Sequence, residues 1–190
     1  MKFQYHSNNG VDAAVDKVFG DYVGHACDVG ANDGLFFSNT MFFEQKGWTV
    51  LCVEPNPLLA EAGRANRKLW REVACSAEDA ELATFKSVKG NNHASSSALM
   101  PEGHADGADL FQVRVRRLDR VLDEAGFPKL DYLTVDVENW ERQVMAGFTV
   151  ERWKPKVIVL EEWTEEVIQI PGYDVVSRHE YDNIYVRREP

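Results

Sequence analysis

The feature that most constrains this chain is the run CDVGANDG, from Cys27 to Gly34. A short, mostly apolar run at 22–26 precedes it, and a longer apolar run at 35–43 follows it. The first is fit for a buried strand, and the second predicts a helix packed on a sheet. The two glycines therefore fall in a strand-to-helix turn. Gly30 permits a tight turn and close ligand approach, and Gly34 brings the helix near the strand.

The spacing of this turn separates two classes of ligand. A dinucleotide fingerprint reads G-x-G-x-x-G, whereas this turn reads D-x-G-x-x-x-G, with Asp28 in place of the first glycine. A carboxylate there repels phosphate and suits an amino group, and the free N–H groups of the next helix suit a carboxylate. The methionine part of S-adenosylmethionine has both groups and fits better than NAD. The alternative is an ordinary glycine-containing turn.

A second acidic position supports a nucleoside ligand. Residues 49–53 read as the next strand, which ends at Glu54. An acidic residue at the end of the second strand is where βαβ nucleotide folds hold a ribose diol. The alternative is a helix-starting turn with Asn56 as N-cap and Pro57 at the first helical position. The two roles are compatible.

Length and charge exclude several classes of protein. The 190 residues are most simply one domain, and 44% hydrophobic residues with 27% charged residues are ordinary for a globular chain. No apolar stretch is long enough to span a membrane, and no leader is visible, so we expect a cytoplasmic protein. A net charge of -10 argues against nucleic acid and anionic membranes as partners. The three cysteines are expected to be buried hydrophobic residues.

Strands that alternate with helices predict a doubly wound, parallel α/β sheet. The expected strands are 22–29, 48–54, 69–75, 81–88, 111–116, 130–138 and 156–160, and a hairpin spans 172–187. The expected helices are 10–20, 35–46, 57–68, 118–125 and 139–148. Residues 1–20 form a capping segment, and the long irregular stretch 87–109 is expected to be a lid over substrate, or else a plain insertion.

Acidic residues recur where the predicted strands end. Asp28, Glu54, Asp136, Glu138 and Glu161 all occupy such positions. In open α/β sheets the ligand crevice lies beyond the carboxyl ends of the strands, so these side chains are expected to share one site. The alternative is that acids near helix N-termini only complement the helix dipole.

Four stretches together resemble a class I S-adenosylmethionine-dependent methyltransferase of the FkbM type. They are 28–34, 53–57, 130–138 with Glu141, and 155–161. The resemblance covers about residues 7–187 and implies a Rossmann-like, mostly parallel seven-stranded sheet with a C-terminal antiparallel hairpin. It also implies methylation of hydroxyl groups, often on sugars or secondary metabolites.

We therefore expect an O-methyltransferase that acts on a small molecule or sugar. The expected S-adenosylmethionine-binding residues are Asp28, Gly30, Ala31, Asn32, Gly34, Glu54, Pro55, Asn56, Ala74 and Cys75. The expected catalytic residues, one of which accepts the hydroxyl proton, are Asp136, Glu138 and Glu161. Two other classes stay open: a nucleoside-binding module without catalysis, and a nicotinamide-dependent oxidoreductase.

Two positions depart from the FkbM pattern. Thr134 stands where members of the family usually carry lysine, and Asn139 stands where they usually carry glycine. The first puts in doubt a mechanism that needs a cation beside Asp136. The second adds an oxygen ligand, so Asp136, Glu138 and Asn139 are the candidate ligands of a divalent metal. A metal-free site is the preferred expectation, because the spacing matches no dedicated metal motif.

Overall fold

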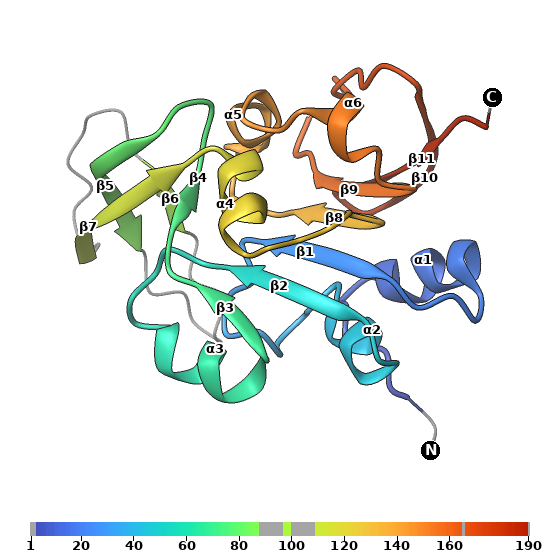
Figure 1. The fold of residues 1–190 in the computed structure, drawn as a ribbon, viewed down its shortest axis with the longest axis horizontal. Helices are drawn as coiled ribbons and strands as arrows, with labels where there is room; N and C mark the ends of the chain where they lie inside the picture. Colours follow the sequence, from blue (N-terminus) through green and yellow to red (C-terminus); the bar gives the residue numbers. More distant parts are fainter. Residues whose placement is uncertain (1–2, 88–96, 100–108, 165, 190) are drawn as a thin grey trace.

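A seven-stranded sheet forms the centre of the molecule (Figure 1). The computed structural model describes residues 3–87, 97–99, 109–164 and 166–189. The strand order is β10-β11-β9-β8-β1-β2-β3, and β11 alone runs antiparallel to the others. These strands are β1 (His25–Val29), β2 (Thr49–Val53), β3 (Leu69–Arg71), β8 (Tyr132–Val135), β9 (Val157–Glu161), β10 (Tyr173–His179) and β11 (Asp182–Arg187). The predicted doubly wound fold and C-terminal hairpin are confirmed.

Helices cover both faces of this sheet (Figure 1). On one face lie α1 (Val11–Phe19), α2 (Met41–Gln45) and α3 (Ala60–Asn66), and on the other lie α4 (Leu118–Glu124), α5 (Glu141–Ala146) and α6 (Val150–Trp153). Alternate residues of β1 supply the two cores: Ala26 packs with α1 and α2, while Cys27 and Val29 pack with α4 and α5. Strands buried on both faces explain why the parallel sheet could be recognised from continuous apolar runs.

A second sheet, which the sequence did not predict, stands beside the first. Its order is β4-β7-β5-β6, with β4 (Ala74–Cys75), β5 (Ala80–Ser87), β6 (Ser97–Leu99) and β7 (Asp109–Arg116). The expected strand 69–75 is therefore two strands in two sheets. Arg116, the last residue of β7, pairs with Glu81 at 2.7 Å. Most of the expected lid, 87–109, lies outside the described residues.

The expected helix 35–46 is reduced to α2, because Asp33 directs the backbone into a turn. Its Oδ1 accepts hydrogen bonds from the N–H groups of Leu35, at 2.9 Å, and Phe36, at 2.7 Å. These bonds close a single turn, and the left-handed backbone at Phe37 prevents a helix from continuing. Asn32 and Phe37 have φ of 51° and 54°, in the left-handed region. Residues 31–40 are therefore an irregular segment.

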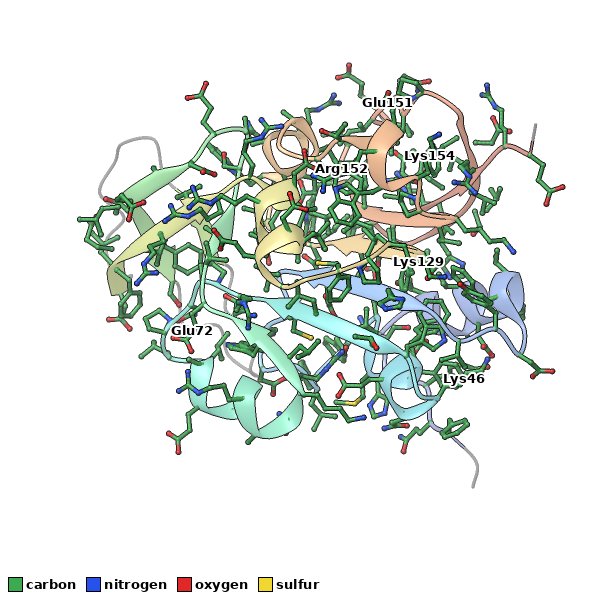
Figure 2. The ribbon with its side chains drawn as sticks, in the orientation of Figure 1. Lys46, Glu72, Lys129, Glu151, Arg152 and Lys154 are labelled. Carbon is green, nitrogen blue, oxygen red and sulfur yellow. The ribbon has the colours of Figure 1, made fainter. Side chains whose placement is uncertain are left out.

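Other differences concern the ends of elements. β1 begins at His25 because Tyr22 and Val23 are 41% and 50% exposed. The expected strand 130–138 ends at Val135, and Glu138 and Asn139 adopt φ of 57° and 71°. Among the described residues no helix is long and apolar enough to cross a membrane. Charged side chains such as Lys129 and Arg152, both labelled in Figure 2, are 51% and 49% exposed to solvent.

Candidate active site

A cavity of about 440 Å³ lies at the carboxyl ends of β1, β2, β8 and β9. It lies within the range of pockets that hold small ligands. Most of the predicted site residues line it: Asp28, Gly30, Ala31, Asn32, Glu54, Pro55, Ala74, Cys75, Asp136, Glu138 and Glu161. Among the described residues that line the cavity, none is lysine, arginine or histidine. The surroundings therefore favour a ligand that carries positive charge.

Three predicted site residues do not line the cavity. Gly34 packs against the side chain of Arg67, since a Cβ on Gly34 would lie 2.5 Å from Arg67 Cγ. Asn56 is 1% exposed, and its Oδ1 accepts the N–H of Leu58 at 3.0 Å within a turn. The expectation of Asn56 as N-cap and Pro57 as the first helical residue is wrong, because α3 begins three residues later, at Ala60. Asn139 is exposed to solvent.

Gly30 joins the ends of β1 and β8. Its φ is 87°, and a Cβ built on it would lie 1.7 Å from the carbonyl oxygen of Asp136. Its N–H donates to Val53 O at 2.9 Å, so the turn also contacts β2. Only a residue without a side chain allows this approach, which brings the residues of three strand ends around one space.

Glu54 is buried, at 6% exposed, and its carboxylate bridges two backbone segments. Oε2 accepts the N–H of Asn32 at 3.1 Å, and Oε1 accepts the N–H of Asn56 at 2.9 Å. Burial raises the pKa of Glu54 to about 7, although these hydrogen bonds act in the opposite direction. Each carboxylate oxygen has a second lone pair, so the group is able to accept further hydrogen bonds from a diol.

Asp28 lies at the end of β1, on the face covered by α1 and α2. It is 5% exposed, and its Oδ2 accepts the hydroxyl of Thr40 at 2.5 Å. Burial raises its pKa, and the nearby guanidinium of Arg67 together with hydroxyl donors lowers it. The carboxylate is thus held by the protein while it lines the cavity.

The other carboxylates crowd together at the ends of β8, β9 and β11. Asp136 is exposed to the cavity, with the carboxyl of Glu161 as a close neighbour. Partial desolvation within the cavity and the neighbouring Glu161, Asp182 and Glu138 raise the pKa of Asp136 well above its ordinary value. Asp182 lies directly opposite Glu161 in the antiparallel pair, and burial and that neighbour raise its pKa to about 7. Like charges directly opposite one another in a sheet repel.

An apolar part of the cavity is formed at the junction of the two sheets. Val73, Ala74, Cys75, Phe85 and Trp140 line it. The indole N–H of Trp140 donates to Ser76 Oγ at 3.2 Å, which fixes the ring. Such surroundings suit a flat, mostly apolar group.

The sequence analysis missed several residues around the cavity. Trp163 is 46% exposed, stacks on Tyr181 with ring centroids 4.1 Å apart, and donates its indole N–H to Glu161 Oε2 at 2.9 Å. Asp182 and Tyr181 come from the hairpin, whose approach to β9 depends on an antiparallel pairing. Trp163 directly follows a strand that ends in two acids, and this position in the sequence could have indicated that it lies at the cavity.

The amino-terminal segment also reaches the cavity. Asn8 and Asn9 line it, and Asn9 Nδ2 donates to Glu180 Oε2 at 2.6 Å. The segment is held by the fully buried Asp12, whose Oδ1 accepts the hydroxyl of Ser7 at 2.7 Å. These contacts place residues of the expected capping segment beside the hairpin.

Thr134 is buried and hydrogen-bonded at the position where the resemblance implies lysine. It is the register partner of Asp28 and is 1% exposed. Its Oγ1 accepts a hydrogen bond from Asn39 Nδ2 at 3.2 Å, and Asn39 lines the cavity. An uncharged pair therefore occupies this position.

Within the described part of the chain, no three His, Cys, Asp or Glu side chains are arranged to hold a metal ion. Glu138 and Asn139 have left-handed backbone, so this stretch is not a strand, and strand alternation does not bring the side chains of Asp136 and Glu138 to the same side. Metal dependence stays a prediction to be tested by experiment.

Comparisons with known proteins agree with this geometry. The chain is 29% identical over 180 residues to the 2-O-methyltransferase NoeI of Sinorhizobium fredii, covering 80% of this chain and 72% of that protein. It is 27% identical over 196 residues to the methyltransferase sdnD of Sordaria araneosa, covering 78% of this chain and 73% of that one.

A solved structure shares the fold. The FkbM methyltransferase of Methylobacillus flagellatus superposes with a TM-score of 0.56 at 14% identity, over 87% of this chain. This chain spans 44% of that longer structure. The family described as "Methyltransferase FkbM domain" matches residues 28–174, which is most of the sequence and includes Asp28, Glu54, Asp136 and Glu161. The chain therefore belongs to the FkbM methyltransferase family.

Proposed function

We propose that this protein transfers the methyl group of S-adenosylmethionine to a hydroxyl of a small-molecule or sugar acceptor. The observation that carries the proposal is that one cavity collects two kinds of carboxylate, Asp28 and Glu54 beside the glycine turn and Asp136 with Glu161 next to them. The family and the name of the 2-O-methyltransferase relative support a hydroxyl as the acceptor group.

The residues beside the glycine turn fit the cofactor. Asp28 would hold the amino group of the methionine part, and Glu54 would accept hydrogen bonds from the ribose diol. The slot at Ala74, Cys75 and Trp140 would hold adenine. When bound, S-adenosylmethionine supplies a methyl group on a positively charged sulfonium, which is a strong electrophile.

The neighbouring carboxylates would handle the proton of the acceptor hydroxyl. A general base must have a pKa high enough to take up a proton near neutral pH, and desolvation together with the neighbouring carboxylates raises the pKa of Asp136. Asp136 would accept the proton, while Glu161 and Glu138 lie within the same charge cluster. The remaining rate enhancement would come from positioning the hydroxyl in line with the methyl group.

Trp163 would form a wall of the acceptor part of the cavity. Its ring is backed by Tyr181 and its N–H by Glu161, so its exposed surface is oriented before any ligand arrives. We also propose that residues 1–190 act as one domain, with Asn8 and Asn9 of the 1–20 segment closing the cavity from the amino-terminal side.

A binding experiment tests the cofactor assignment. S-adenosylhomocysteine should raise the melting temperature of the protein by mass action, and NAD and NADP should not. Glu54→Ala should weaken S-adenosylhomocysteine binding roughly tenfold to a hundredfold, because a buried charge-assisted hydrogen-bonding group is lost. The exposed Glu61→Ala serves as the control. Stabilisation by NAD alone would refute the proposal.

A turnover experiment separates catalysis from binding without catalysis. Labelled S-adenosylmethionine is incubated with a metabolite mixture, and methylated products are identified. Binding of S-adenosylhomocysteine without any product would favour a nucleoside-binding module. The reaction is then repeated with chelator and with added magnesium, manganese or calcium. Full activity in chelator is expected, and activity that a divalent ion alone restores would identify a metal-dependent enzyme.

A further inference from the structure

A single buried guanidinium lies beneath the glycine turn. Arg67 follows α3 and is 4% exposed. Its Nε donates to Glu44 Oε2 at 2.8 Å, and its Nη1 donates to Gly34 O at 2.9 Å and Ser38 Oγ at 3.1 Å. Its Nη2 donates to Thr40 Oγ1 at 2.8 Å. One cation thus holds three points of the segment that follows β1.

The hydroxyl of Thr40 links the guanidinium of Arg67 to the carboxylate of Asp28 through two hydrogen bonds. A guanidinium only donates hydrogen bonds, so Thr40 Oγ1 must accept from Arg67. A hydroxyl has one proton, and with the acceptor side occupied that proton is directed to Asp28 Oδ2, at 2.5 Å. Thr40 is completely buried, so water does not compete for these bonds. The chain of contacts fixes the orientation of the Asp28 carboxylate.

The segment 31–40 has no helix to hold it in place. It lines the cavity with Ala31, Asn32, Phe36, Phe37, Ser38 and Asn39. Two of these residues have left-handed backbone, which persists only where the surroundings stabilise it. The contacts of Arg67 with Gly34, Ser38 and Thr40 provide that stabilisation. Gly34, expected to bring a helix close, instead leaves room for the Arg67 side chain.

We propose that Arg67, acting through Thr40, is a positioning residue that orients the Asp28 carboxylate toward the amino group of the cofactor. The inference rests on the proposed function, because it assigns Asp28 to the methionine part of the ligand. Arg67 itself does not line the cavity.

The charges around Asp28 agree with this role. Arg67 faces both Glu44 and Asp28, so one cation balances two carboxylates and leaves one negative charge for a cationic ligand. Glu54 on the β2 side, Cys52 on β2 and Tyr132 on β8 also face Asp28. Of these, Arg67 is the group whose charge lowers the pKa of Asp28.

Two ligands and one pair of variants test the proposal. S-adenosylhomocysteine carries the amino acid part, and 5′-methylthioadenosine lacks it while keeping adenine and ribose. Thr40→Val removes the linking hydroxyl, and Thr40→Ser keeps the hydroxyl. Thr40→Val should weaken S-adenosylhomocysteine roughly tenfold and leave 5′-methylthioadenosine within about twofold. Thr40→Ser should restore the affinity for S-adenosylhomocysteine.

The pH dependence gives a readout that general destabilisation does not move. Loss of the hydroxyl donor raises the pKa of Asp28, so the acid-side loss of S-adenosylhomocysteine affinity should shift to higher pH in Thr40→Val. Titration of Glu54 affects the binding of both ligands, so the ratio of S-adenosylhomocysteine affinity to 5′-methylthioadenosine affinity reports on Asp28 alone. As the pH is lowered, this ratio should begin to fall at a higher pH in Thr40→Val than in the wild type.

Variants of arginine complete the test. Arg67→Gln should reproduce the selective loss, while Arg64→Gln, which removes an exposed arginine paired with Glu72, should not (Figure 2). Equal loss of both ligands in Thr40→Val and Arg67→Gln, or no loss of either, would overturn the positioning role while leaving the proposed function intact. If neither ligand binds the wild type, the proposed function fails, and the inference fails with it.

Discussion

Two groups of carboxylates line the same cavity, and the protein treats them differently. Beside the glycine turn, Asp28 and Glu54 each accept hydrogen bonds from fixed protein groups. At the ends of β8, β9 and β11, Asp136, Glu161 and Asp182 face one another. The first group has its orientation set before a ligand arrives. In the second group the carboxylates repel one another, and binding of a proton or a cation reduces this repulsion.

The difference fits two kinds of task. A group that only binds a cofactor gains affinity when its orientation is fixed in advance, because less entropy is lost on binding. A group that must take up a proton near neutral pH gains from a raised pKa, which crowding supplies. We infer that binding and proton transfer are divided between the two groups, and the following experiments probe that division.

The largest effect is expected where the two groups meet. Gly30→Ala would place a Cβ 1.7 Å from the carbonyl oxygen of Asp136, at a φ of 87°. The clash involves backbone at the ends of two central strands, so we expect a loss of roughly 3 kcal/mol or more of unfolding free energy, measured by denaturant titration. Binding of S-adenosylhomocysteine should be lost as well.

The matched control is Gly126→Ala. Gly126 also has a positive φ, of 71°, but a Cβ there would meet nothing within 4 Å. Its cost should be about 1 kcal/mol, from the backbone conformation alone. Equal costs at the two positions would show that the close approach of β1 and β8 is not what fixes the cavity.

The next largest effect distinguishes the two groups of carboxylates, because substitutions in one should change turnover and substitutions in the other should change cofactor affinity. Asp136→Asn removes the proposed proton acceptor and should lower turnover about 10²- to 10⁴-fold, while S-adenosylhomocysteine affinity changes little. Glu54→Ala should show the opposite pattern, with weakened affinity and turnover that recovers at saturating cofactor. Initial rates and calorimetry on both variants measure this, and turnover unchanged in Asp136→Asn would transfer the role to Glu138 or Glu161.

The sequence predicted the sheet and most of the cavity because both depend on local patterns. Apolar runs that end in Asp28, Glu54 and Asp136 mark buried parallel strands and the residues that follow them. The carboxyl ends of such strands meet at one edge whatever the details of the helices. The position of these acids could therefore be predicted without any knowledge of side-chain contacts.

What the sequence did not reveal depends on contacts between distant residues or on single side chains. Asp33 replaces the start of the expected helix with a turn, and Arg67 then holds the segment from a position 33 residues after Gly34. Asp182 reaches Glu161 through the antiparallel pairing of the hairpin. Periodicity carries no information about such contacts. It predicted the strands at 81–88 and 111–116, but not that they pair with each other in a sheet of their own.

The smallest expected effect concerns stability in the crowded group. The pKa of Asp182 is raised to about 7, above the ordinary value of about 4 in the unfolded chain. The folded protein therefore binds more protons than the unfolded one between these values, and stability falls as pH rises from about 4 to about 7. Ionised Asp182 faces Glu161 across the strand pair, and like charges in that position destabilise a sheet.

Asp182→Asn should therefore stabilise the free protein, by on the order of 1 kcal/mol at pH 8, with a gain that shrinks toward pH 4. Urea titrations at the two pH values measure it. Asp174→Asn on β10 is the control from the same hairpin: Asp174 accepts a hydrogen bond from Arg188 at 2.9 Å, which lowers its pKa, so its removal should not stabilise. If Asp182→Asn lowers stability at pH 8, the carboxylates of this group are compensated in the free protein, and the contrast with Asp28 and Glu54 does not hold.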